Sequence, residues 1–224
     1  MDKELEKTLK YMSKYNKKDG RRGTVKVYTD KVFIEGNVLY ATDGKIMITS
    51  ENTSGIKDFA IYRDAKLHNS EDSLVKQTWT EIERQHCGQK ISIFRKLMLN
   101  YAENKNTLSF DIDFSDSILP VVLQCTHARR YDSYDRARID FTASEVVFTF
   151  DGGKDEDGGV TAFYGDVIKN VKGTEEDILL NAYFLIEILK VTKEHKAHFE
   201  YCSDNRNLTV TSGKYTFYWM PCDW

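Results

Sequence analysis

Residues 37–48 have the sequence Asn37-Val38-Leu39-Tyr40-Ala41-Thr42-Asp43-Gly44-Lys45-Ile46-Met47-Ile48. Two short runs within it, 38–41 and 46–48, are rich in residues that favour β-strands, and Asp43-Gly44 between them is a turn signal. Glycine adopts the left-handed backbone of tight turns without steric cost. The segment therefore predicts a β-hairpin.

An amphipathic segment precedes the hairpin. If residues 2–18 are helical, at about 100° per residue, Leu5, Leu9 and Met12 lie on one side of the helix. Asp19-Gly20 follow the segment, and glycine commonly closes a helix. We therefore expect a helix that packs its apolar side against a core.

The opposite side of this helix carries a row of lysines, which fall within about 40° of one line. The row consists of Lys3, Lys7, Lys10, Lys14 and Lys17. An outward lysine row is suited to a distributed negative charge, and the nucleic-acid backbone is the commonest such surface. The alternative is a charged face that only keeps the helix in water.

The rest of the chain alternates between further strands and two further helices. Helices are predicted over 70–86, where Ser70 or Asp72 can cap the start, and over 181–193, whereas 91–104 suits either a helix or a strand. A polar loop is expected from Asp151-Gly152-Gly153 onward. The remaining predicted strands are 25–28, 32–34, 107–114, 121–125, 137–141, 146–150, 197–201, 208–211 and 215–219.

The hairpin has a counterpart near the end of the chain. Asn207-Leu208-Thr209-Val210-Thr211-Ser212-Gly213-Lys214 resembles residues 37–45 with one residue deleted, and a helix followed by strands is predicted before both. The pattern favours a duplicated helix-plus-meander unit. We therefore predict an α+β fold of two similar domains, 1–120 and 121–224, in which helices pack on antiparallel sheets.

Composition limits the classes of function. The 224 residues are 41% hydrophobic and 30% charged, which is ordinary for a folded globular protein. With 32 basic and 35 acidic side chains, the net charge is −3, so the chain as a whole does not attract nucleic acid. Any such binding must come from local segregation of charge, for which the lysine row is the candidate.

Cysteine usage and hydropathy point to an intracellular protein without a zinc site. The four cysteines, Cys87, Cys125, Cys202 and Cys222, form no CxxC pair and no regular framework. No apolar run approaches the roughly 18 residues of a membrane-spanning helix, and the N-terminal segment is not a signal peptide. We expect a cytoplasmic protein with free thiols and no membrane segment.

No set of catalytic or metal-binding residues is recognisable. His195 and His198 form an HxxH pair without the glutamate that a zinc protease requires, and the acidic loop from Asp151 lacks the later glutamate of a calcium loop. His86-Cys87 are adjacent, but adjacency in sequence does not make a nucleophile and base. We therefore expect a protein that is not an enzyme and that needs neither metal nor cofactor.

Three segments resemble a known family. Residues 38–45 resemble the strand-turn-strand with an ATDG core in bacterial DNA sliding clamps, the beta subunits of DNA polymerase III. Residues 178–190 resemble the last helix of those clamps, and Tyr218-Trp219-Met220-Pro221 resembles their near-terminal strand; residues 55–135 match poorly. The resemblance implies a DNA-clamp fold and a polymerase processivity factor that encircles double-stranded DNA without reading its sequence.

The resemblance also implies an assembly and a DNA-facing surface. Bacterial clamps have three domains per chain and dimerise, whereas this chain is long enough for two, so a six-domain ring needs a homotrimer. The alternative is a structural or interaction module that does not encircle DNA. Besides the row on the first helix, the basic residues expected to meet phosphates are Arg129, Arg130, Lys190 and Lys193.

Clamps of this family bind peptides of polymerases and repair factors in an apolar pocket, and clamp loaders also act on the ring. Carried over by position, the peptide-binding candidates are Gly44, Lys45, Ile46, Met47, Tyr218, Trp219, Met220 and Pro221. Tyr218 and Trp219 stand where the family has small aliphatic residues, so a bulkier pocket is expected. The alternative is that Trp219 and Met220 are only the two faces of a terminal strand.

Overall fold

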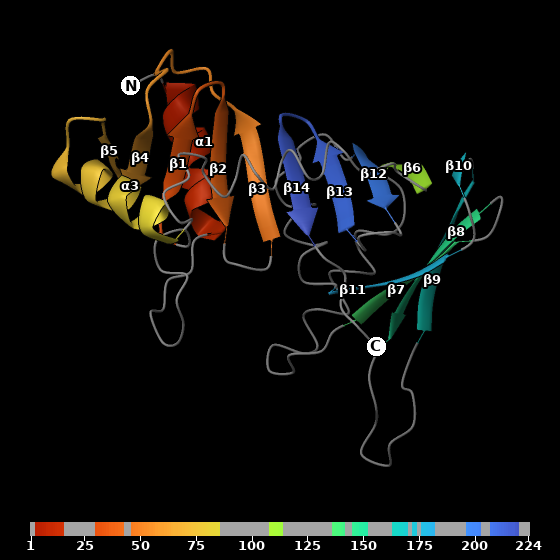
Figure 1. Ribbon diagram of the computed structural model, residues 1–224. Helices are drawn as coiled ribbons and strands as arrows, with labels where there is room; N and C mark the ends of the chain where they lie inside the picture. The colour runs from red at the N-terminus through yellow and green to blue at the C-terminus, as the bar shows by residue number, and fades with distance from the viewer. Residues whose placement is uncertain are drawn as a thin grey trace, which may run out of the picture. The chain divides into compact units, whose positions relative to one another are not determined.

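The computed structural model describes residues 3–15, 30–42, 46–85, 108–113, 136–141, 145–151, 163–169, 172–173, 176–181, 196–202 and 207–219 (Figure 1). The chain forms two compact units. The first unit comprises Met1–Asn104 with Lys214–Trp219, and the second comprises Lys105–Gly213 with Met220–Trp224. The predicted domains 1–120 and 121–224 differ from these units in two places, because residues 105–120 fall in the second unit and Lys214–Trp219 falls in the first. A scheme of two clamp-like domains stays a prediction.

Six strands of the first unit form an antiparallel arrangement in the order β14-β3-β2-β1-β4-β5. Their bounds are β1 (Val32–Glu35), β2 (Val38–Thr42), β3 (Ile46–Glu51), β4 (Ala60–Arg63), β5 (Lys66–His68) and β14 (Tyr215–Trp219). The predicted strands 32–34, 38–41, 46–48 and 215–219 are confirmed. The last strand of the chain thus lies beside β3, with Tyr218 opposite Met47.

Turn chemistry explains how these strands are connected. Gly36, between β1 and β2, has a φ of 58°, the left-handed value that glycine adopts readily. Asp64 and Ala65, between β4 and β5, have φ values of 50° and 59°, the double left-handed turn that matches the twist of a two-residue hairpin. Strands β4 and β5 were not predicted from the sequence.

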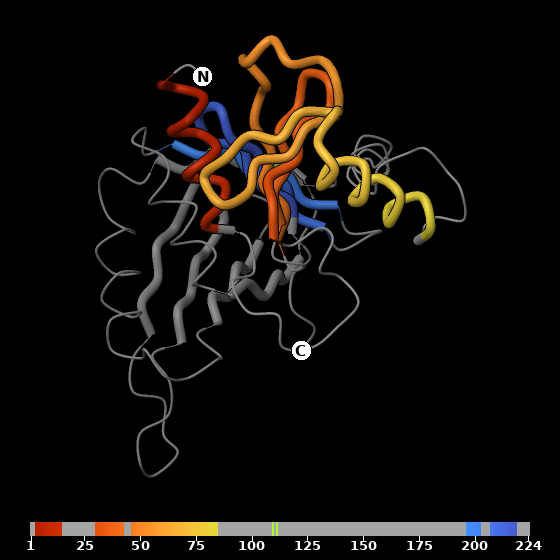
Figure 2. Tube along the Cα trace, turned by 90° about the vertical axis from the view of Figure 1, so that its left-hand side faces the viewer, coloured from red at the N-terminus to blue at the C-terminus, as the bar shows by residue number. Residues whose placement is uncertain are grey.

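Two helices pack on opposite sides of these strands (Figure 2). One is α1 (Lys3–Met12), which continues as the 3-10 turn η1 (Ser13–Tyr15), and the other is α3 (Ser73–Gln85). The predicted helices 2–18 and 70–86 are therefore confirmed in type. The first is shorter as an α-helix, and the Ser13 hydroxyl donates to the Leu9 carbonyl oxygen at 2.7 Å, a side-chain bond that often bends helix ends.

The second unit contains two groups of antiparallel strands. One group has the order β10-β6-β12-β13 and the other β11-β7-β8-β9. The bounds are β6 (Leu108–Asp113), β7 (Arg136–Phe141), β8 (Glu145–Asp151), β9 (Phe163–Lys169), β10 (Lys172–Gly173), β11 (Glu176–Asn181), β12 (Lys196–Cys202) and β13 (Asn207–Ser212). Helices on antiparallel sheets make the protein α+β, as predicted.

The outcomes of the other element predictions fall into two groups. The strands predicted at 107–114, 137–141, 146–150, 197–201 and 208–211 are confirmed, whereas β9, β10 and β11 were not predicted. The segments 25–28, 91–104 and 121–125, and the helix predicted at 181–193 except for its first residue, lie outside the described residues. That first residue, Asn181, is the last residue of β11.

Candidate nucleic-acid interface and peptide site

Helix α1 separates apolar and basic side chains as its spacing predicted. Leu5 is 4% exposed, and Leu9 and Met12 are fully buried. The lysines on the other side are all exposed: Lys3, Lys7, Lys10 and Lys14. Because the buried stripe faces the core, the lysine row on the opposite side faces solvent. The exposure of these four lysines is confirmed, and their binding to DNA stays a prediction.

The lysines of the row differ in their pairing. Lys10 forms an ion pair with Glu6 at 2.5 Å, one turn away on the same helix. The hydrogen bond and the charge of Lys10 lower the pKa of Glu6, and those of Glu6 raise the pKa of Lys10. Within the described part of the chain, Lys3, Lys7 and Lys14 form no ion pair. Three ammonium groups of the row are therefore not engaged by any described carboxylate.

One flank of α1 is tied to the start of β14. The Lys214 ammonium donates to Glu4 Oε1 at 2.6 Å and to Thr8 Oγ1 at 2.7 Å. The rings of Tyr11 and Tyr215 are 5.0 Å apart between centroids. Burial raises the pKa of Tyr215. The contact of Lys214 with α1 was not predicted from the sequence. Gly213-Lys214 is the counterpart of Gly44-Lys45 in the repeated hairpin.

The other residues predicted to meet DNA are not placed by the structure. They are Lys17, Arg129, Arg130, Lys190 and Lys193, which lie outside the described residues. In the described part of the chain, the candidate interface therefore consists of the lysines of α1.

The predicted peptide site is placed in part. Ile46 is 1% exposed and Met47 is 5% exposed, both in β3, and half-buried Tyr218 lies opposite Met47 on β14. Trp219 is the last residue of β14, opposite Ile46. The other four candidates, Gly44, Lys45, Met220 and Pro221, lie outside the described residues. The structure thus brings four predicted residues, Ile46, Met47, Tyr218 and Trp219, to one pair of strands.

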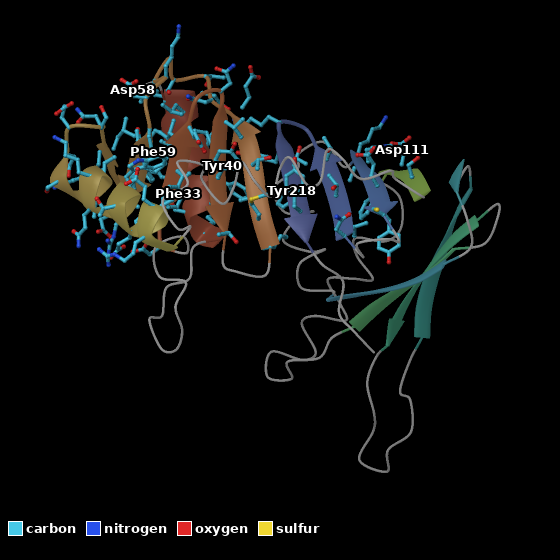
Figure 3. All side chains as sticks on the ribbon, in the orientation of Figure 1. Phe33, Tyr40, Asp58, Phe59, Asp111 and Tyr218 are labelled. Atoms are coloured by element: carbon cyan, nitrogen blue, oxygen red, sulfur yellow. The ribbon has the colours of Figure 1, made fainter. Side chains whose placement is uncertain are left out.

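Met47 belongs to an apolar cluster to which α3 contributes, and Tyr218 packs against this cluster. Figure 3 labels Phe33, Tyr40, Phe59 and Tyr218. Its buried members are Phe33, Tyr40, Met47, Ile61, Val75 and Ile82, and its partly buried members are Val38, Phe59, Trp79 and Tyr218. The rings of Phe59 and Trp79 are 4.8 Å apart between centroids. Phe59, Trp79 and Tyr218 are the partly exposed aromatic side chains here, and apolar side chains of this kind are typical of adaptable peptide grooves.

Helix α3 has a side-chain cap at its N-terminus. Asp72 Oδ1 accepts a hydrogen bond from the Leu74 backbone N–H at 2.8 Å, and Asp72 Oδ2 lies 2.9 Å from His68 Nδ1. The hydrogen bond with His68, followed by that with Leu74, lowers the pKa of Asp72. Of the two residues predicted to cap this helix, Ser70 and Asp72, Asp72 is therefore the N-cap.

Among the residues that the structure describes, no group of three or more histidine, cysteine or acidic side chains is arranged to hold a metal ion. His198 of the HxxH pair instead contacts Asp111, with His198 Nδ1 2.7 Å from Asp111 Oδ1. Among the described helices, none has the length and apolar character needed to cross a membrane.

Solved bacterial sliding clamps are similar to this chain over nearly its whole length. The DNA polymerase sliding clamp of Caulobacter crescentus matches with a TM-score of 0.65 and 11% identity, covering 99% of this chain and 64% of that chain. DNA polymerase III subunit beta of Borrelia burgdorferi matches with a TM-score of 0.64 and 11% identity, covering 98% of this chain and 62% of that chain.

The chain has the DNA-clamp fold. A third similar structure is the Helicobacter pylori beta clamp bound to a DNA ligase peptide, with a TM-score of 0.58 and 11% identity over 98% of this chain and 63% of that chain. The chain thus spans somewhat less than two thirds of the length of these clamps. No protein-family model and no curated protein sequence matches it.

Proposed function

We propose that this protein is a sliding-clamp-like DNA polymerase processivity factor, a non-enzymatic scaffold that encircles double-stranded DNA in the cytoplasm. The observation that carries the proposal is the combination of the clamp fold with an exposed lysine row on α1, which contains Lys3, Lys7 and Lys14 without carboxylate partners among the described residues. A ring needs weak, evenly spread attraction to the phosphate backbone rather than recognition of bases.

The chemistry of lysine suits this role. A lysine ammonium is a compact, hydrated point charge on a flexible stem, without the planar fork by which arginine grips one phosphate. Contacts of this kind release counterions, so they are blind to sequence and weaken steeply with salt. The net charge of −3 opposes unspecific binding elsewhere on the surface. Binding is therefore concentrated on the row.

The proposed assembly is a homotrimeric ring. The chain spans less than two thirds of the bacterial clamps that it resembles, so three copies supply what two copies supply there. The test is the mass in native buffer at micromolar concentration. We expect the mass of three 26.0 kDa chains. A stable monomer would favour the alternative, an interaction module on the same fold that does not encircle DNA.

The proposed partners are double-stranded DNA, a DNA polymerase, repair-factor peptides and a clamp-loader-type protein. Peptides are proposed to dock beside Met47 and Tyr218, where the apolar cluster reaches the partly buried Phe59 and Trp79. A solved clamp that is similar to this chain binds a DNA ligase peptide. Tyr218→Ala is expected to weaken binding of a polymerase-derived peptide, whereas an unchanged affinity would place the peptide elsewhere.

A further inference from the structure

Lys214 joins two parts of the first unit that are far apart in sequence. It directly precedes β14, and its ammonium reaches the first two turns of α1. The contacts are 2.6 Å to Glu4 Oε1, 2.7 Å to Thr8 Oγ1 and 5.6 Å to the centroid of the Tyr215 ring. A lysine ammonium has three donors, and two of them have oxygen partners here.

The helical positions of these partners define where the contact lies. At about 100° per residue, Glu4, Thr8 and Tyr11 fall on one flank of α1, between the lysine row and the buried stripe. The hydroxyl of buried Thr8 also donates to the Glu4 carbonyl oxygen at 2.9 Å. On the same flank the Lys14 ammonium lies 5.6 Å from the centroid of the Tyr11 ring.

The pairing changes the charge that α1 presents. Helix α1 carries two carboxylates, Glu4 and Glu6, next to the row. Glu6 is paired with Lys10, which belongs to the row, whereas Glu4 is paired with Lys214, which does not. Lys214 therefore neutralises Glu4, and this ion pair uses no lysine of the row.

We infer that Lys214 is a positioning residue of the DNA-facing surface: it neutralises Glu4 and holds α1 against β14, so that the lysine row faces outward in one orientation. The role in DNA binding rests on the proposed function, whereas the anchoring of α1 does not. A charge-assisted contact with two partners on one helix flank restricts the rotation of that helix. Lys214 thereby acts through α1, with or without a phosphate contact of its own.

The first part of the test measures α1 in the absence of DNA. Amide hydrogen exchange over residues 3–12 is compared for the wild type, Lys214→Gln, Glu4→Gln and the double variant. We expect exchange about three to ten times faster in Lys214→Gln, and a double variant no faster than the quicker single variant, because both lose one shared contact. Lys214→Arg should stay near the wild type. Unchanged exchange in Lys214→Gln, or additive single effects, would overturn the anchoring role.

The second part measures affinity for a DNA duplex at low salt. Lys214→Gln should bind about three to ten times more weakly, while Lys76→Gln, an exposed lysine of α3 paired with Glu71 at 3.0 Å, should bind like the wild type. Equal effects of the two variants would overturn the DNA part of the inference. A wild type that does not bind DNA would refute the proposed function instead, and the exchange data would still decide whether Lys214 anchors α1.

Discussion

Helices α1 and α3 pack on the same strands of the first unit but present different surfaces to solvent. Both bury an apolar stripe, with Leu9 fully buried on α1 and Ile82 fully buried on α3. On α1 the outward side is a row of lysines, whereas α3 carries charges of both signs, Lys76 and Arg84 with Glu81 and Glu83, and Lys76 is paired with Glu71. Amphipathicity therefore explains the packing of both helices, and only the segregation of charge singles out α1 as an interface.

The two helices also differ in how they are anchored. Helix α3 contributes to the large apolar cluster and is capped by Asp72. Helix α1 adds to its apolar stripe a polar contact from Lys214, at the other end of the chain. A structural helix needs only to stay folded, whereas an interface helix must also hold its charges in one direction. The following changes test this difference, from the largest expected effect to the smallest.

Truncation of the α3 stripe should cost stability and spare DNA binding. Ile82→Ala removes a fully buried side chain from the apolar cluster, and such cavities cost about 2–5 kcal/mol of unfolding free energy. Denaturant unfolding measures the loss. At a temperature where the variant is folded, its affinity for duplex DNA should match the wild type. Weaker binding by fully folded protein would show that α3 takes part in the interface.

Removal of the row should abolish most DNA binding and leave the fold intact. Replacing Lys3, Lys7, Lys10 and Lys14 with glutamine removes up to four phosphate contacts, and we expect a loss of at least about 100-fold in affinity at low salt, with a shallower salt dependence. The matched control replaces four exposed basic residues outside α1, Lys57, Lys66, Lys76 and Arg84, with glutamine and should bind normally. Equal losses in both proteins would mean that charge alone, and not its segregation on α1, governs binding.

Loss of the cap should destabilise α3 in a pH-dependent way. Because hydrogen bonds lower the pKa of Asp72 in the folded state, its contribution is present above the ordinary pKa of aspartate and is lost as pH falls through the lowered value. Asp72→Ala should lower Tm by about 2–4 °C at pH 7, and this deficit should shrink below about pH 4.

Asparagine at position 72 is the control for the cap, because it also caps helices but does not titrate. At neutral pH, Asp72→Asn should therefore lower Tm by less than Asp72→Ala does. A deficit in Asp72→Ala that stays constant from pH 7 to the most acidic pH reached would contradict the linkage. Thermal unfolding followed by circular dichroism across this range measures both variants.

The smallest effect concerns the ion pair between Glu6 and Lys10. Glu6→Gln removes a carboxylate and frees Lys10, so affinity for duplex DNA should rise by about two- to threefold at low salt. Glu71→Gln, which frees Lys76 in the same manner near α3, should leave the affinity unchanged. Fluorescence anisotropy with a labelled duplex resolves such differences. A decrease on Glu6→Gln would mean that the pair is needed to orient Lys10.

Local patterns predicted many of the elements that are long enough to show a period, although β9 with seven residues and β11 with six were not predicted. Helix α3 and strands such as β6 and β13 have apolar residues at regular spacing, and Asp43-Gly44 stands between β2 and β3 in the sequence. By contrast, β5 has three residues and β10 has two, which is too short for an alternation to be recognised. The pairing of β14 with β3 joins residues that are far apart in sequence, and no local signal specifies such a register.

The candidate site was predictable from the sequence only where a local pattern specifies it. The exposure of Lys3 and Lys7 follows from the buried stripe on their own helix. Placing Met47 near Tyr218 required the resemblance to clamps, because the two strands are far apart in the chain. The contact of Lys214 with Glu4 could not be predicted, since it depends on where β14 lies relative to α1.

The central claim, that several copies close around a duplex, is tested most directly by an image of the purified particle. Negative-stain electron microscopy should show rings with a central hole that admits a DNA duplex, with three repeats around the circumference. Solid particles without a hole, or isolated single chains at micromolar concentration, would contradict the claim.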